Sequence, residues 1–148
     1  MKRIFILSLV CLLLTVVVHA AGAGTGAQEM VEKAATFLKA NGKGAAFVEF
    51  NKKNGKFAEG IMYIYVVDFK GNVLAHGGNN SMVGKNMYEL KDSDRKPFMK
   101  EIIDRGVSEG SGWVDYRWPN LPMTNKALLR SAYFKKVKDV IIICSVLK

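Results

Sequence analysis

The run from Ile61 to Asp68 limits the fold of this chain more than any other segment. Its first seven residues are Ile-Met-Tyr-Ile-Tyr-Val-Val, so a strand formed here is apolar on both faces. Strands that are buried on both faces have such continuous hydrophobic runs, whereas half-exposed strands alternate between apolar and polar residues. The run therefore predicts a central strand in a sheet that is covered on both sides.

Turn signals after this run predict an antiparallel hairpin. The sequence Asp68-Phe69-Lys70-Gly71-Asn72 is typical of a turn, and Val73 to His76 is predicted to be the returning strand. The glycine and asparagine residues at 77–80 then end the hairpin. A loop with a short helical stretch from Met82 to Leu90 is expected to follow.

Hydrophobic periodicity predicts helices on either side of the hairpin. Apolar residues recur at helical spacing from Gln28 to Ala40, and Asn41-Gly42 is a suitable stop. A second short helix is expected from Ala45 to Asn51. A further helix is expected from Phe98 to Ser108.

The last third of the chain predicts three more strands. They are Trp113–Trp118, Arg130–Val137 and Val140–Leu147, with a loop over 121–129 and a tight turn at Lys138-Asp139. This order of elements predicts an α+β fold, in which helices pack on an antiparallel sheet of about five strands.

The N-terminus has the organisation of a secretory signal peptide. Met1-Lys2-Arg3 supplies positive charge, Ile4 to Val18 is mostly apolar, and small residues follow. Cleavage after Ala20 or after Ala23 fits the small residues there. The sequence therefore predicts an exported protein.

We expect residues 1–23 to be the signal peptide and 24–148 to form a single domain, which is periplasmic or secreted. The alternative is an uncleaved N-terminal anchor that leaves the domain extracytoplasmic. The apolar run is near the short end for a membrane span, and this favours cleavage.

The chain is basic, with 22 Lys and Arg residues against 13 Asp and Glu residues. A basic surface attracts nucleic acid or anionic membranes, but an exported domain does not meet chromosomes, and the lysines lie in separate polar stretches. We therefore expect a solvated surface and no nucleic-acid partner. Cys144 is the one cysteine after the signal, so no internal disulfide is expected.

Four segments of the chain follow a known pattern in this order: Tyr63 to His76, Val83-Gly84-Lys85-Asn86, Gly110 to Asn120, and Ser131-Ala132-Tyr133-Phe134-Lys135. Together they resemble the single Cache (type 2) sensor family, over nearly all of the chain after the signal. The resemblance implies a PAS-like fold with a long N-terminal helix packed on a five-stranded antiparallel sheet. It also implies short helices around a ligand pocket on the other face.

Members of that family are typically extracytoplasmic sensor modules of chemoreceptors and histidine kinases. Several are similar to binders of small carboxylates such as acetate, propionate, pyruvate or lactate. The resemblance thus implies a small-molecule sensing module whose ligand is a small organic acid. We expect it to act without an output domain of its own, with a membrane receptor or kinase as partner. A homodimer through the N-terminal helix is a further hypothesis.

The chain departs from the family pattern at two places near the predicted pocket. The loop 121–129 is more apolar than in the family. The last strand ends Ser145-Val146-Leu147, where the family usually has a Gly-x-Tyr pattern. These departures support an alternative function, a non-catalytic scaffold or protein-interaction module with a vestigial pocket.

Strand parity indicates which side chains line the pocket, because alternate residues of a strand point to the same face. We expect six side chains to face one pocket: Tyr63, Tyr65, Trp113, Arg117, Tyr133 and Lys135. Three residues of the opposite parity are expected under the N-terminal helix or at the strand end: Tyr116, Trp118 and Phe134.

Arg117 is the expected carboxylate anchor, because a guanidinium matches a carboxylate in two parallel hydrogen bonds. Lys135 adds a second positive charge, and the tyrosines donate hydroxyl groups. The alternative is that Arg117 pairs with Asp115 on the same face and needs no ligand. His76 is either a surface or capping histidine, or a pocket residue that donates a hydrogen bond to a carboxylate or keto oxygen.

An enzyme is a third function class that the residues disfavour. With one histidine after the signal, Ser81 and Ser131 have little base chemistry to share. The sequence contains no zinc pattern and no phosphate loop. We expect no catalytic residue, no metal site and no cofactor.

Overall fold

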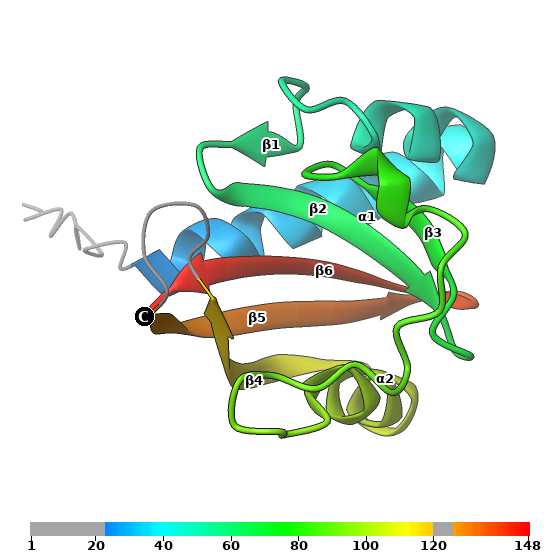
Figure 1. Cartoon of the computed structure of the whole chain (residues 1–148). Coiled ribbons are helices and arrows are strands. Elements are labelled where there is room, and N and C mark those ends of the chain that lie inside the picture. The colour runs from blue at the N-terminus through cyan, green and yellow to red at the C-terminus, as the bar shows by residue number, and fades with distance from the viewer. Residues whose placement is uncertain (1–22, 120–125) are drawn as a thin grey trace, which may run out of the picture.

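The structure, a computed structural model, describes residues 23–119 and 126–148. Residues 1–22 of the predicted signal peptide and residues 121–125 of the predicted loop 121–129 lie outside these ranges, so what the sequence predicts for them remains a prediction. The described chain forms a sheet with a long helix on one face and a shorter helix on the other (Figure 1). No helix within the described ranges is long and apolar enough to cross a membrane.

The sheet contains six strands, and neighbouring strands are antiparallel throughout. The main order is β3-β2-β6-β5-β4, and the short β1 pairs with the start of β2. The predicted α+β fold is therefore confirmed, with β1 as an additional strand. The strands are β1 (Ala58–Glu59), β2 (Met62–Asp68), β3 (Val73–His76), β4 (Ser111–Pro119), β5 (Ala127–Val137) and β6 (Val140–Leu147).

Two local predictions are wrong. Ala127 to Leu129, expected in a loop, belong to β5 because they pair with Arg117 to Pro119 in β4. The stretch Met82–Leu90 is not a helix, and only the single 3-10 turn η1 (Asn80–Met82) is helical. The chain beyond η1 instead runs along β3, where the Val73 N–H donates to the Lys85 carbonyl oxygen at 2.9 Å.

Helix α1 (Ala23–Phe50) covers one face of the sheet and contains a break at Gly42. Gly42 has φ 76° and ψ 169°, a conformation that is essentially restricted to glycine. The predicted stop at Asn41-Gly42 is thus confirmed, and the second short helix continues after the break. Small buried residues such as Ala34 and Ala35 allow α1 to lie close to the strands.

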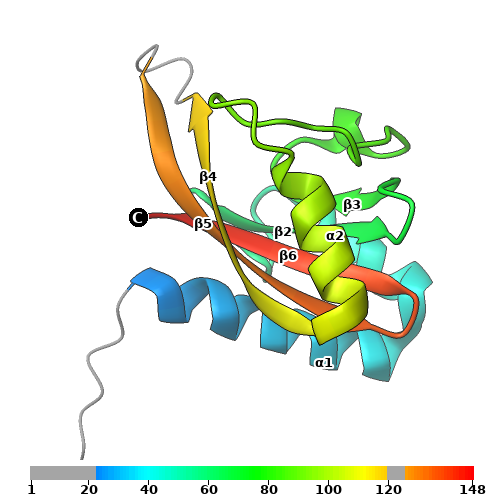
Figure 2. The ribbon, with the colours of Figure 1, turned by 90° about the horizontal axis from the view of Figure 1, so that it is seen from below.

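Helix α2 (Phe98–Glu109) lies on the opposite face, as the two views together show (Figure 2). Its contact with the sheet is close at Gly106, where an added Cβ would lie 2.7 Å from Cδ1 of the buried Ile141. The sheet therefore has two separate cores, one under α1 and one under α2 and the loop that precedes it.

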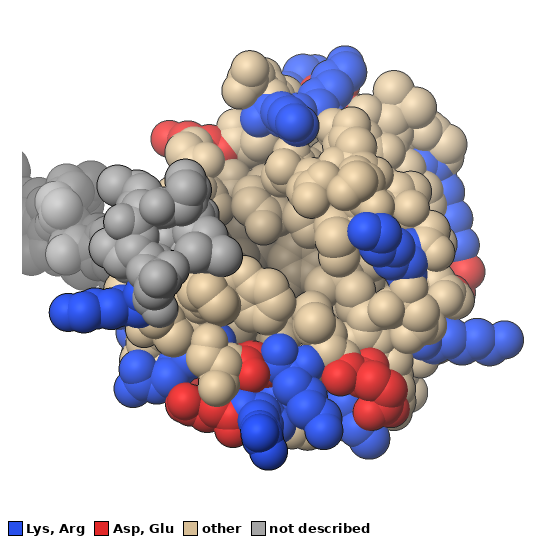
Figure 3. Space-filling model, viewed as in Figure 1, with Lys and Arg blue, Asp and Glu red and all other residues tan. Residues whose placement is uncertain are grey.

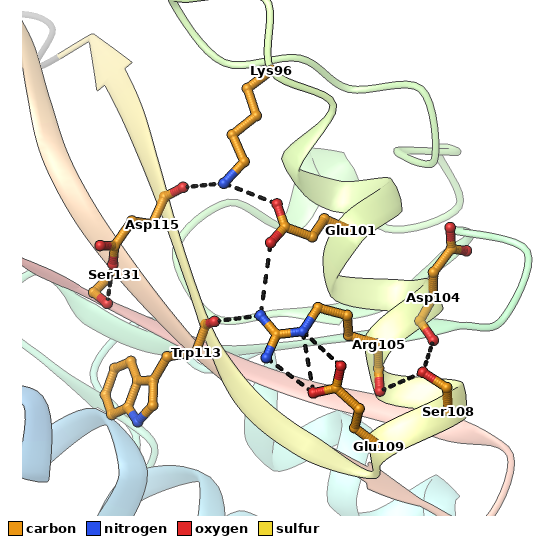
Figure 4. A network of polar contacts seen from close by, with 9 residues as sticks. All are labelled: Lys96, Glu101, Asp104, Arg105, Ser108, Glu109, Trp113, Asp115 and Ser131. Carbon is orange, nitrogen blue, oxygen red and sulfur yellow. Dashed lines mark hydrogen bonds and ion pairs between the residues drawn. The ribbon is translucent and has the colours of Figure 1, made fainter.

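Charged side chains attach α2 to the edge strand β4 (Figure 4). Lys96 Nζ donates to the Asp115 carbonyl oxygen, and Arg105 Nη1 donates to the Trp113 carbonyl oxygen, each at 2.8 Å. Glu101 lies between the two cations, with Oε2 2.8 Å from Lys96 Nζ and Oε1 3.7 Å from Arg105 Nη1. These contacts satisfy carbonyl groups that an edge strand would otherwise leave unpaired.

Two glycines allow the destabilisation caused by an unfavourable φ angle to be measured separately from the destabilisation caused by a close contact. Gly71 and Gly84 both have φ 86°, but an added Cβ at Gly71 would lie 2.7 Å from the Tyr88 backbone nitrogen. An added Cβ at Gly84 would meet no atom within 4 Å. We expect Gly84→Ala to lower the free energy of unfolding by about 1 kcal/mol, and Gly71→Ala to lower it by roughly 1–3 kcal/mol more.

Urea unfolding of the two variants, followed by tryptophan fluorescence, measures this difference. Gly84→Ala is the matched control because its φ angle is the same. Equal destabilisation by the two substitutions would contradict close packing of the 83–88 loop against the β2–β3 turn.

Candidate functional site

The face of the sheet that carries α2 is hollowed at its centre, over β2 and β6 (Figure 3). The hollow is lined mainly by uncharged residues, and the charged side chains in this view lie mostly around its margin. Seven side chains on this face form what we call the aromatic cluster: Tyr63, Tyr65, His76, Tyr116, Trp118, Arg130 and Ser145.

One half of the aromatic cluster comes from the β2–β3 hairpin. The His76 ring lies 5.0 Å from the Tyr63 ring and is stacked on Tyr65 at 5.5 Å between centroids. Tyr65 and His76 are paired directly across the two strands. An added Cβ at Gly78 would lie 2.6 Å from the Tyr63 ring, so glycine there lets the chain cross closely over this ring.

The other members of the cluster lie on β4, β5 and β6, and Phe98 of α2 packs against them. Phe98, the first residue of α2, stacks on Tyr116 with 4.2 Å between centroids and an interplanar angle of 4°. Its ring also meets Trp118 edge-on at 5.8 Å. The Tyr116 hydroxyl donates to Ser145 Oγ on β6 at 3.0 Å, in a buried hydrogen bond. The cluster is thus tied together across β4 and β6.

Arg130 is the cation of the aromatic cluster. It lies opposite Tyr116 in the β4–β5 pairing, on the same face of β5 as the buried Phe134. Its Nε is buried and has no hydrogen-bond partner, and no carboxylate of the described residues forms an ion pair with it. A buried N–H donor without an acceptor is costly, so the Nε of Arg130 is suited to an anion supplied by a ligand.

Burial sets the protonation states of the cluster. It raises the pKa of Tyr63 and Tyr116 and raises the pKa of Tyr65 well above its ordinary value, while the Arg130 charge opposes the shift at Tyr63 and Tyr116. Burial also lowers the pKa of His76. At neutral pH the tyrosines are therefore protonated and the histidine is uncharged.

A backbone contact determines which nitrogen of His76 carries the proton. The Asn79 N–H donates to His76 Nδ1 at 2.9 Å, so Nδ1 is an acceptor. In a neutral imidazole the proton then resides on Nε2. His76 thus caps the loop through Nδ1 and carries its N–H at Nε2. Donation from Nε2 to a ligand stays a prediction.

The expected single pocket is wrong, because the structure divides its residues between the two faces. Tyr63 and Tyr65 lie together on the α2 face with His76. Trp113 and Tyr133 instead pack against the core under α1, with 5.0 Å between their rings. The Trp113 ring points away from α2 (Figure 4).

Lys135 also lies on the α1 side of the sheet. Its Nζ is 2.6 Å from Glu32 Oε2 on α1, and the Tyr133 hydroxyl lies 3.4 Å from Glu32 Oε1. These contacts give Lys135 and Tyr133 a structural partner on the helix. The sequence grouping placed them correctly on one face of β5 but on the wrong side of the sheet.

Arg117 is half-exposed, with 50% of its side chain accessible. Its Nε lies 3.2 Å from Asp94 Oδ2, so its partner is not the expected Asp115. Asp115 pairs instead with Lys148 at 2.5 Å. Arg117 is therefore a surface ion-pair residue, and the structure does not bring it to the aromatic cluster.

Sequence reasoning missed four members of the cluster: Tyr116, Trp118, Arg130 and Ser145. Of these, Tyr116 and Trp118 were expected under the N-terminal helix or at the strand end. Tyr116 and Phe134 belong to the core under α2, and Trp118 packs against it, not under the N-terminal helix. The signal that could have found Arg130 is its alternation with Ala132 and Phe134 along one strand.

Two observations concern potential metal ligands and the cysteine in the described ranges. No three His, Cys, Asp or Glu side chains there are grouped in a way that could hold a metal ion. Cys144 is buried in the core under α1, where burial raises the pKa of its thiol to about 12.

Comparisons with known proteins agree with this fold. The family model for the Cache domain matches residues 49–145. A methyl-accepting chemotaxis protein from Vibrio parahaemolyticus is 21% identical, with a TM-score of 0.68 over 84% of this chain and 87% of that chain. A Cache chemosensory domain described for carboxylic acid recognition is also 21% identical, with a TM-score of 0.67 over 84% of this chain and 92% of that one.

The periplasmic sensor domain of a chemotaxis protein is 18% identical, with a TM-score of 0.63 over 83% of this chain and 88% of that one. The comparison with curated proteins gives no match. At these identities the solved structures establish a shared fold.

The lowered pKa of His76 makes stability depend on pH. Above the unfolded-state pKa of about 6.5 the histidine is neutral in both states. Below it the unfolded chain binds a proton that the folded protein resists, so stability falls as the pH drops towards the folded-state pKa. We expect the free energy of unfolding to decrease from about pH 7 to about pH 5.5.

His76→Asn is the matched variant, because its side-chain oxygen can accept the Asn79 N–H in place of Nδ1. Urea unfolding across this pH range should give a flat profile for the variant. A profile that falls equally in both proteins would assign the dependence to other groups.

Proposed function

The chain belongs to the Cache domain family, and from this premise we propose that it is a sensing module that binds a small carboxylate in the aromatic cluster. The observation that carries the proposal is Arg130, a cation of the aromatic cluster whose buried Nε has no partner among the described residues. A ligand carboxylate would supply the missing acceptor and the missing negative charge.

The remainder of the aromatic cluster has the composition of a site for a small organic acid. Ligand pockets are mostly apolar or aromatic with a few converging polar groups. Here the rings of Tyr63, Tyr116 and Trp118 supply the walls, and the hydroxyl groups and His76 Nε2–H supply donors. We propose Arg130 as the anchor in place of Arg117, and Tyr116 and Trp118 in place of Trp113 and Tyr133.

The acetate, propionate, pyruvate or lactate class fits this arrangement, since one cation needs one carboxylate. The solved Cache chemosensory domain that recognises carboxylic acids supports the same ligand class by analogy of fold. We propose no catalytic role for the cluster.

The cellular setting is also a proposal. The charged and then apolar N-terminal segment supports export, so we propose that the domain works outside the cytoplasmic membrane. A sensor in this location needs a membrane receptor or kinase to read the bound state, and we propose a partner of that kind. A homodimer through α1 remains a hypothesis.

Binding of small carboxylates tests the function. We expect calorimetry with C2 to C4 acids to detect binding to the purified protein. Arg130→Ala should weaken binding about 10-fold to 100-fold, since a hydrogen bond to a charged group is typically worth 1.5–3 kcal/mol. Arg130→Lys should retain part of the affinity, because lysine keeps the charge but not the two parallel donors.

Arg117→Ala is the matched control, because it removes an arginine that is exposed and paired with Asp94. It should bind the acids as well as the unmodified protein does. If no acid binds to the folded protein, the scaffold or protein-interaction alternative is favoured. If Arg117→Ala weakens binding and Arg130→Ala does not, the anchor has been wrongly assigned.

A further inference from the structure

The turn that follows β3 is attached to the aromatic cluster through His76 and Tyr63. We call the segment 77–82 the capping turn. The Asn79 N–H donates to His76 Nδ1 at 2.9 Å. Gly78 lies against the Tyr63 ring, where an added Cβ would be 2.6 Å from Cε1. The capping turn therefore covers one side of the Tyr63 ring while the bond to His76 is intact.

The bond to the His76 side chain differs from the other bonds of the capping turn, because its acceptor can take up a proton. The Gly77 N–H donates to the Ile64 carbonyl oxygen at 2.9 Å, and the Ser81 N–H donates to Asn79 Oδ1 at 3.1 Å. Backbone and amide groups of this kind do not titrate. A proton on Nδ1 of His76 instead places two N–H donors opposite each other, so the bond to Asn79 is lost.

The cluster around the His76 ring supplies no negative charge that would hold the protonated form in place. The ring faces two titratable side chains, the phenols of Tyr63 and Tyr65, and burial keeps both protonated at neutral pH. The charged residue of the cluster is Arg130, which is itself a cation. No carboxylate of the described residues forms an ion pair with His76.

The α1 side of His76 adds no free acid either. There Asn51 Oδ1 accepts the His76 backbone N–H at 2.8 Å, and an amide side chain does not titrate. Glu49, at the end of α1, lies 2.6 Å from Lys52 Nζ in an ion pair of its own. The ring thus gains a proton only at the expense of its contact with the capping turn.

We propose that His76 is a pH-sensitive switch, which holds the capping turn against Tyr63 when its ring is neutral and releases the turn when its ring is protonated. Release exposes the ring to solvent, so the proton binds more readily to the released form and low pH favours release. Since burial lowers the pKa of His76, the transition lies below about pH 6.5. Because Tyr63 belongs to the aromatic cluster, access to the cluster then depends on pH. The inference does not rest on the proposed function, because it involves no ligand.

Amide hydrogen exchange tests the switch on the purified protein without any added acid. NMR signals of the His76 ring nitrogens report its protonation between about pH 7 and about pH 4. We expect the protection of the Asn79 amide, relative to the intrinsic exchange rate at each pH, to fall about tenfold or more as the ring gains its proton. The Met82 amide should follow with the same midpoint. Amides in the paired region of β2 and β6 should keep their protection, because the release is local.

His76→Asn is the matched variant, because its side-chain oxygen can accept the Asn79 N–H and does not titrate. Protection of the Asn79 amide should be independent of pH in this variant. An equal loss in both proteins overturns the inference, as does unchanged protection in the unmodified protein while the ring is protonated. A ring that stays neutral down to about pH 4 overturns it too. If the amides of β2 and β6 lose protection at the same midpoint, the proton unfolds the domain and the inference is also wrong.

Discussion

Burial of β2 and β6 on both faces is the constraint on which the rest of the structure depends. The two strands pair from Ile64 to Asp68, and the side chains of Ile141, Ile142 and Ile143 are essentially inaccessible. Such a pair is stable only if apolar layers cover it on both sides. Helix α1 supplies one layer, and α2 with the preceding loop supplies the other.

The two layers differ in how completely they cover the sheet, and this difference creates the candidate site. Helix α1 runs along its face with small residues at the contact and an ion pair from Glu32 to Lys135. Helix α2 is short and is attached to the β4 edge through Lys96 and Arg105. The centre of that face therefore stays hollow, and mainly uncharged residues line it (Figure 3).

The sequence predicted the helices and strands better than it predicted on which face of the sheet each side chain lies. The continuous apolar run and the turn residues predicted β2, β3, β6 and α2 closely, because local periodicity and turn chemistry determine them. Parity also grouped Trp113 with Arg117 correctly within one strand. It could not decide which group meets α1, because β4 and β5 carry aromatic residues on both faces. Consequently Arg117 was taken for the anchor, and Arg130 was missed.

The sequence by itself determined the α+β class, the order of strands along the chain, the break at Gly42 and the resemblance to sensor domains. These depend on periodicity, glycine conformation and motif order, which are local properties. Only the tertiary structure decided that Arg130 shares a face with Tyr63, Tyr116 and Ser145. The reason is physical: strand pairing and the side on which α1 packs bring together residues that are distant in the chain, and no local pattern records that choice.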